Sequence, residues 1–79
     1  MIIKNGTFEI IENEQIKKIK GETIDGSYVE IRYKNGWLDI LASANAGMSM
    51  RTIYRDRVEY EMSIKDMIKK LDIIFENGD

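Results

Sequence analysis

Residues 27–42 read SYVEIRYKNGWLDILA, and this pattern predicts a two-stranded β-hairpin. Asn35-Gly36 lies between two runs in which apolar and polar residues alternate. A type I′ turn favours this dipeptide, because both of its central residues need a positive φ angle. A two-residue loop pairs Lys34 with Trp37 and continues outward to Val29 with Ala42. A slip of one residue would exchange the faces of one strand, so the pattern predicts the register as well as the hairpin.

In this register the two faces of the hairpin differ in character. The apolar face, which we expect to be buried, carries Val29, Ile31, Tyr33, Leu38, Ile40 and Ala42. The opposite face carries Tyr28, Glu30, Arg32, Lys34, Trp37, Asp39 and Leu41. The hairpin therefore predicts a sheet with one face on a core and the other open to water or to a partner.

Upstream of the hairpin, Thr7 to Glu12 is predicted to be a strand, whereas residues 13–21 fit two structures. Asn13 is a suitable cap for a short helix that would end at Gly21. The same residues also fit a strand leading into Asp25-Gly26. The strand is favoured for the second half of this segment, because it gives a sensible pairing with the hairpin.

The connection between that strand and the hairpin is predicted to be a three-residue loop, 25–27. A two-residue loop would place Lys20 and Glu22 on the buried face, and burying two charges is costly. The three-residue loop pairs Thr23 with Val29 and leaves only exposed like-charge neighbours. Such neighbours cost a few tenths of a kcal/mol. Gly26 suits the left-handed position of this loop.

Downstream of the hairpin, Ser43 to Ser49 is predicted to be a loop, and Met50 to Met62 a long strand. Alternation places Arg51, Ile53, Arg55 and Arg57 of this strand on the outer face. Asp56 interrupts the apolar set on the other face, so we expect a bulge or bend near it.

The last segment predicts an amphipathic helix. Ser63 is an N-cap residue with Asp66 three positions later, which resembles a capping box. Gly78 is the predicted end of the helix. The apolar residues that follow Ser63 at helical spacing are Ile64, Met67, Ile68, Leu71, Ile74 and Phe75. The predicted fold is α+β: one domain, residues 1–79, with a mainly antiparallel meander of four to five strands and one C-terminal helix packed on one face.

Composition excludes several classes of chemistry. The chain contains no Cys and no His, which removes disulfides, thiol nucleophiles and imidazole catalysis. Its carboxylates are dispersed and match no ligand spacing, so we predict no metal site, no cofactor, no catalytic residue and no enzymatic activity. No segment reaches the roughly 18 apolar residues of a membrane span, and the N-terminus lacks a signal-peptide pattern. We therefore expect a cytoplasmic protein that does not contact membranes.

The outer face of the sheet is the candidate binding site, because Trp, Tyr and Arg are enriched at interface hot spots. Its predicted partner-binding residues are Tyr28, Arg32, Lys34, Trp37, Leu41, Arg51, Ile53 and Arg55, with Ile24 beside them. The small, uncharged loop adds Asn45, Gly47 and Met48 as candidates for closing over a ligand or entering a groove. The alternative interpretation is a solvated sheet face beside an inert loop. The run Lys17-Lys18-Ile19-Lys20 is typical of a solvated stripe.

The sequence fits three kinds of binding partner for this chain. A chain this small, rich in Ile, Lys and Asn, resembles in size and composition the small inhibitors of phages and mobile elements, anti-CRISPR and other anti-defence proteins among them. No motif carries this resemblance, and it implies binding to a host protein. The alternative is a small nucleic-acid-binding regulator using Arg and aromatic residues, although the net charge of −2 argues against it. A homodimer through outer faces or strand edges is the third.

Overall fold

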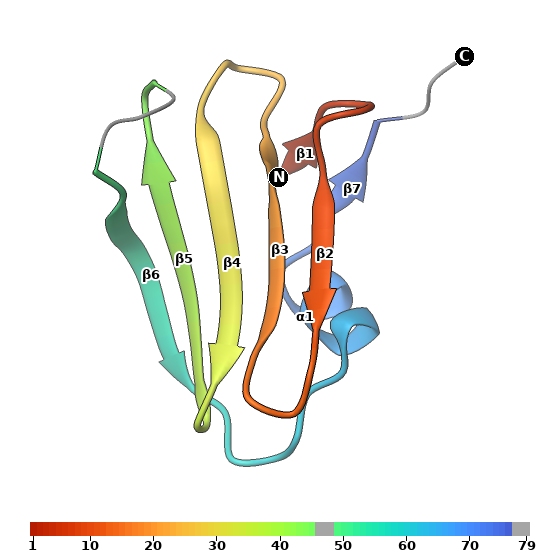
Figure 1. Cartoon of the computed structure of the whole chain (residues 1–79), viewed down its shortest axis with the longest axis vertical. Helices are drawn as coiled ribbons and strands as arrows, with labels where there is room; N and C mark the ends of the chain where they lie inside the picture. Colours follow the sequence, from red (N-terminus) through yellow and green to blue (C-terminus); the bar gives the residue numbers. More distant parts are fainter. Residues whose placement is uncertain (46–48, 77–79) are drawn as a thin grey trace.

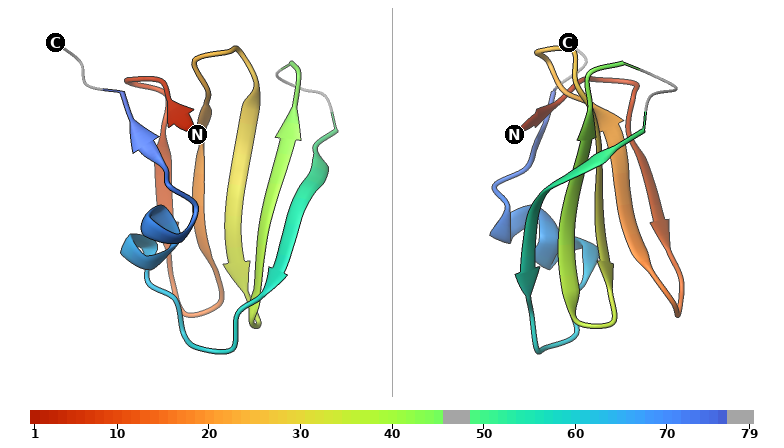
Figure 2. Two further views of the ribbon diagram at one scale, coloured as in Figure 1. Left: turned by 180° about the vertical axis from the view of Figure 1, so that it is seen from behind. Right: turned by 90° about the vertical axis from the view of Figure 1, so that its left-hand side faces the viewer.

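The computed structural model describes residues 1–45 and 49–76, and it consists of two layers. One layer is a five-stranded antiparallel sheet in the order β2-β3-β4-β5-β6. Its strands are β2 (Glu9–Glu12), β3 (Lys17–Glu22), β4 (Tyr28–Lys34), β5 (Trp37–Ser43) and β6 (Arg51–Arg57). The other layer holds α1 (Ile64–Lys70) and the parallel pair β1 (Ile2–Ile3) and β7 (Ile74–Phe75). Both lie on the same face of the sheet (Figures 1 and 2), so the α+β prediction is confirmed.

The β4–β5 hairpin has the predicted register. Lys34 pairs with Trp37, and the ladder continues through Ile31 with Ile40 to Val29 with Ala42. Asn35 and Gly36 have φ angles of 52° and 81°, as a type I′ turn requires. The local turn signal and the alternating pattern therefore determine this part of the fold together.

The β3–β4 pairing differs from the prediction by two residues. Residues 17–22 form a strand, but Gly21 pairs with Val29 and Ile19 with Ile31. The connection therefore spans residues 23–27. The Thr23 amide donates to the Ser27 carbonyl at 2.8 Å, and Gly26 has a φ of 92°. Since a shift of two keeps every side chain on its face, the predicted faces are right although the predicted partners are wrong.

The new register also improves the electrostatics of the outer face. Lys20 lies opposite Glu30, whereas the predicted register put it opposite Arg32. Lys18 lies opposite Arg32, but its Nζ is 3.8 Å from Glu30 Oε2. Opposite charges across a ladder stabilise a sheet, which is a physical reason for the longer loop.

The bulge in β6 lies at Ile53 and not near Asp56. Tyr54 pairs with Ile40, whereas Thr52 pairs with Leu41, so Ile53 is the extra residue. The strand also ends at Arg57 and does not reach Met62. The bulge reverses the alternation before it, and this puts Arg51 opposite Ala42, on the face that carries the helix.

The helix begins as predicted but ends early. The Asp66 amide donates to Ser63 Oγ and the Ser63 amide to Asp66 Oδ2, both at 3.0 Å, which completes a capping box. Asp72 has a φ of 53°, and the Ile73 amide donates to the Ile68 carbonyl at 2.9 Å. This is a Schellman ending, with Asp72 in the left-handed position that glycine usually takes. Residues after it turn into β7, so the predicted continuation of the helix through Ile74 and Phe75 is wrong, and the predicted end, Gly78, lies outside the described residues.

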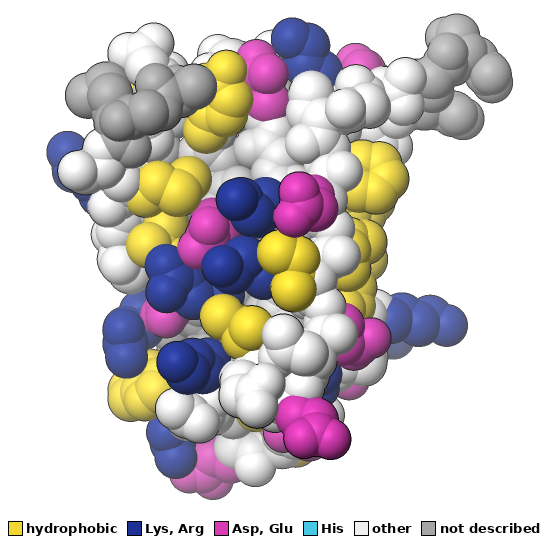
Figure 3. All heavy atoms as spheres, viewed as in Figure 1, with side chains coloured by type: hydrophobic (Ala, Val, Ile, Leu, Met, Phe, Trp, Pro, Cys, Tyr) yellow, Lys and Arg dark blue, Asp and Glu magenta, His cyan; other side chains and the backbone are white. Residues whose placement is uncertain are grey.

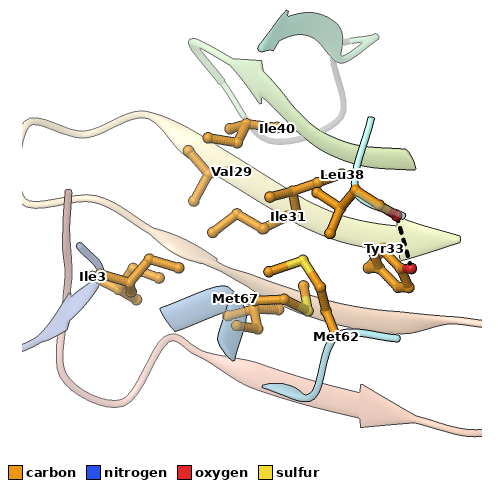
Figure 4. Packing of buried hydrophobic residues seen from close by; sticks show 11 residues of the cluster. Ile3, Val29, Ile31, Tyr33, Leu38, Ile40, Met62 and Met67 are labelled. Carbon is orange, nitrogen blue, oxygen red and sulfur yellow. Dashed lines mark hydrogen bonds between the residues drawn. The ribbon is translucent and has the colours of Figure 1, made fainter. Parts of the chain in front are cut away.

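The core lies between the sheet and the layer of α1 and β1 (Figure 4). Its buried residues are Ile3, Ile19, Val29, Ile31, Tyr33, Leu38, Ile40, Val58, Met62, Met67 and Ile73. The single proton of the Tyr33 hydroxyl is donated to the Tyr60 carbonyl at 2.7 Å, with the Val58 carbonyl as a second, longer acceptor at 3.3 Å. Within residues 1–45 and 49–76, no helix has the length and apolarity needed to cross a membrane.

Candidate functional site

The outer face is the side of the sheet opposite α1, and strand pairing defines its residues. Its middle carries Lys18, Glu30, Arg32, Lys34, Trp37, Asp39, Leu41, Arg55 and Arg57, with Lys20 and Tyr28 toward one end. Acidic and basic side chains intermingle across the middle of this face (Figure 3). The face therefore carries a charged lattice, by which we mean the network of acidic and basic side chains that surrounds a few apolar ones.

Two carboxylates form the base of this lattice. Glu30 and Asp39 are largely buried, with 12% and 15% of their side chains exposed. Glu30 Oε2 lies 3.0 Å from Arg32 Nη2, and Asp39 Oδ1 lies 3.6 Å from Arg55 Nη1. Both carboxylates are thus largely desolvated and ion-paired, Glu30 at hydrogen-bond distance from its arginine and Asp39 through an Oδ1 atom that accepts no hydrogen bond within the described residues.

Trp37 lies beside two arginines. The guanidinium carbons of Arg55 and Arg57 are 4.4 and 5.3 Å from its ring centroid. Arg57 Nη1 also donates to the Asn35 carbonyl at 3.2 Å, which ties the arginine to the hairpin turn. Cation–π contacts of this kind hold a ring in place. Trp37 is nevertheless 36% exposed, so an oriented aromatic surface remains open.

The structure brings most of the predicted site residues together. Tyr28, Arg32, Lys34, Trp37, Leu41 and Arg55 all lie on the outer face. Asn45 lines a hollow of about 340 Å³ at one end of that face, together with Tyr28 and Lys20. The other two loop candidates, Gly47 and Met48, lie outside the described residues.

Three residues predicted for the outer face lie elsewhere. The bulge at Ile53 reverses the alternation, so Arg51 lies on the helix side of the sheet. Ile24 and Ile53 line a hollow on the same side. This hollow has a volume of about 510 Å³, and Met1, Ile2 and Ala42 also line it. Ile53 and Ile24 are 59% and 55% exposed. These two exposed isoleucines thus lie on the face that was predicted to be covered.

Sequence reasoning missed this hollow because it treated one helix as a cover for the whole sheet. The seven residues of α1 extend only about 10 Å, whereas five strands span roughly 19 Å. After the early helix end the chain turns into β7, whose partner β1 comes from the other end of the chain. In the local sequence, this helix end is indicated by Asp72, a residue less suited than glycine to the left-handed position.

The two carboxyl groups whose pKa values are shifted belong to a local turn and to a helix cap. The Thr23 hydroxyl and the Ser27 amide lower the pKa of Asp25, and the Ser63 amide and hydroxyl lower that of Asp66. Asp25 is exposed in the β3–β4 connection, and Asp66 is partly exposed at the helix cap. Among the described residues, no three acidic side chains gather in a way that could hold a metal ion.

Comparison of the chain with protein-family models, with curated proteins and with solved structures finds no match.

Proposed function

We propose that this chain is a non-catalytic protein-binding module that acts through its outer face, with Trp37 as the anchor. The observation that carries the proposal is the state of that ring: it is partly exposed, yet the guanidinium groups of both Arg55 and Arg57 lie close to it. Trp and Arg are the residue types that most often dominate binding energy at protein interfaces. Tyr28 and Leu41 extend the contact surface along the same face.

The lattice below the ring supports this proposal. Glu30 and Asp39 hold Arg32 and Arg55 in ion pairs before any partner arrives. Ordering a long side chain on binding costs about 0.5–1.5 kcal/mol, and a preorganised arginine avoids part of that cost. A surface of aromatic and arginine side chains is what a protein partner with a complementary acidic and apolar patch would recognise.

The partner we propose is a host protein, bound by an inhibitor of the phage or mobile-element type. This part of the proposal follows from the size and composition of the chain. Binding would block the partner's surface sterically or shift it to an inactive conformation. Neither mechanism requires a catalytic group on this chain.

The test is affinity capture from a host lysate with matched aromatic variants. Trp37→Ala should lose the captured protein, because the anchor is removed. Tyr60→Ala should retain it, because Tyr60 is a 57% exposed aromatic residue outside the sheet. Circular dichroism of both variants checks that each is folded. Equal capture by the wild type and by folded Trp37→Ala would reject the outer face as the binding site.

Nucleic-acid binding is the second candidate, and one observation favours it. Six cations on the outer face oppose four carboxylates, although the whole chain has a net charge of −2; these are Lys18, Lys20, Arg32, Lys34, Arg55 and Arg57 against Glu9, Glu22, Glu30 and Asp39. The pairing of Arg32 and Arg55 with carboxylates leaves fewer charges for phosphates, so we rank this function second. It predicts capture that nuclease abolishes and affinity that falls steeply with salt.

A further inference from the structure

Strand β6 forms one edge of the five-stranded sheet. In the described part of the chain, no strand pairs with its far side. Every residue of β6 is exposed except Asp56, which is partly buried. An edge strand of seven residues offers a row of free backbone groups, and proteins use such edges to bind extended segments of other chains.

The ladder indicates which backbone groups of β6 are free. The Val58 amide donates to the Gly36 carbonyl at 2.8 Å, in the same register as the pairs Leu38–Asp56 and Ile40–Tyr54. In an antiparallel ladder, residues bonded to the neighbour alternate with residues whose N–H and C=O point away. The backbone groups of Arg55 and Arg57 are therefore directed at the free edge.

The charges of β6 select the kind of strand that fits beside it. Arg55 and Arg57 project on the outer face along this edge. Arg51 lies near the other end of β6, on the helix side of the sheet. Asp56 is the only acidic residue between Arg51 and Arg57. A second copy of β6 would bring arginines against arginines, which disfavours self-pairing. An acidic strand would instead place one carboxylate beside Arg57 and a second beside Arg55, whose guanidinium already has Asp39 at 3.6 Å on its own sheet.

Between Arg51 and Asp56, the helix side of β6 carries two exposed apolar side chains. Ile53 and Tyr54 are 59% and 37% exposed, and Ile53 borders the hollow that also contains Ala42 and Val29. Side chains of a strand alternate between the two faces of a sheet. A strand added here would thus direct every second side chain toward Ile53 and Tyr54, where an apolar group can be buried.

We propose that β6 pairs with an extended segment of the partner protein in which acidic and apolar residues alternate. The acidic side chains lie beside Arg55 and Arg57, the apolar ones lie over Ile53 and Tyr54, and the segment's backbone pairs with the free N–H and C=O groups. This inference rests on the proposed protein-binding function, because it gives the chemistry of the partner segment that lies next to Trp37.

The test uses two synthetic peptides, acetyl-VEVEVEV-amide and acetyl-VKVKVKV-amide, and ¹⁵N-labelled full-length protein. The glutamate peptide should shift the Arg55 and Arg57 amide resonances and slow their hydrogen exchange by about tenfold when about nine-tenths of the protein is bound. The lysine peptide should do neither. Equal binding of both peptides, or binding that leaves these two amides unprotected, overturns the proposal.

Variants separate backbone pairing from charge. Arg55→Gln removes the charge and should weaken binding of the glutamate peptide by up to about fivefold, as expected for an exposed ion pair. Arg55→Pro also removes an N–H that the ladder does not use, which edge strands tolerate. It should weaken binding by at least about tenfold more than Arg55→Gln, because strand addition loses a backbone bond and meets the proline ring. Equal affinities of the two variants would overturn the proposal.

Two further measurements complete the design. The amide exchange of the wild type decides the question if Arg55→Pro does not fold. Sedimentation of the free protein should show a monomer, and an edge already occupied by a second copy would overturn the proposal. If capture depends on Trp37 but the β6 amides are not protected, strand pairing alone is rejected. If capture does not depend on Trp37 and the β6 amides are not protected either, the protein-binding function is rejected too.

Discussion

At the scale of single residues, Lys17 has a structural role that its sequence context conceals. It belongs to a run typical of a solvated stripe, yet only 14% of its side chain is exposed. Its Nζ donates to the Met62 carbonyl, lies 2.7 Å from Glu61 Oε1 and sits 5.8 Å from the Tyr33 ring centroid. Lys17 therefore holds the segment between β6 and α1 against the sheet.

Replacing Lys17 with alanine should destabilise the protein by about 1–2 kcal/mol, because a charged hydrogen bond to a part-buried carbonyl is lost. Glu61→Ala is the matched control. Glu61 is 79% exposed, so its loss should cost less than about 0.5 kcal/mol. Urea unfolding followed by Trp37 fluorescence measures both. Equal destabilisation by the two variants would mean that the ion pair, and not the bond to Met62, carries the effect.

Asp66 gives the helix cap a pH dependence. Hydrogen bonds from Ser63, the backbone amide first, lower the pKa of Asp66 below its ordinary value of 3.8. A carboxyl whose pKa is lower in the folded state stabilises the fold above the unfolded pKa, and this stability is lost as pH falls through the folded pKa. The stability advantage of the wild type over Asp66→Asn should therefore be full at pH 5–7 and shrink below about pH 3.8. Thermal unfolding across this range measures it, and a constant difference would contradict the assignment.

At the scale of elements, the β4–β5 turn connects fold and site. Gly36 has a φ of 81°, and its carbonyl accepts the Val58 amide. A Cβ atom at Gly36 would lie 3.0 Å from Arg57 Nη1, on the arginine that flanks Trp37. The turn therefore affects both the pairing of the hairpin and the position of Arg57 beside the Trp37 ring.

Gly36→Ala should lower the free energy of unfolding by about 1–2 kcal/mol, because left-handed backbone is strained for a residue with a Cβ atom. Asn35→Gly is the control and should change it by less than about 0.5 kcal/mol, since either residue suits this turn position. Urea midpoints measure both effects. An unchanged midpoint for Gly36→Ala would show that position 36 tolerates a different turn.

At the scale of the whole molecule, Ile3 joins the two ends of the chain to the sheet. It is fully buried, pairs with Phe75 and bridges to Thr23. A Cβ atom at Gly21 would lie 2.6 Å from Ile3 Cγ2, so the absence of a side chain in β3 makes the close packing possible. The small layer of β1 and β7 is thus part of the core.

Ile3→Ala should cost about 2–5 kcal/mol, which is a large part of the stability of a small domain. Ile74→Ala, at a 53% exposed position of the neighbouring strand β7, should cost less than about 1 kcal/mol. Thermal unfolding of both variants makes the comparison. A small effect of Ile3→Ala would mean that the sheet and α1 are stable without β1.

The sequence by itself determined the features that depend on neighbours in the chain. Asn35-Gly36 and the alternation around it specified the hairpin register, and Ser63 with Asp66 specified the helix start. Most of the candidate site followed from these, because Tyr28, Arg32, Lys34, Trp37 and Leu41 lie on the hairpin itself. Local chemistry is sufficient where both partners of an interaction are a few residues apart.

Only the tertiary structure decided the features whose partners are distant in sequence. The bulge at Ile53 depends on how β6 meets β5, and it moves Arg51 off the outer face. The helix ends at Lys70 because Ile74 and Phe75 pair with Ile2 and Ile3, more than 70 residues away. The order of the strands, which makes β6 an edge of the sheet, also depends on such pairings. The energies that select them come from packing and cross-strand contacts, which alternation along one strand does not record.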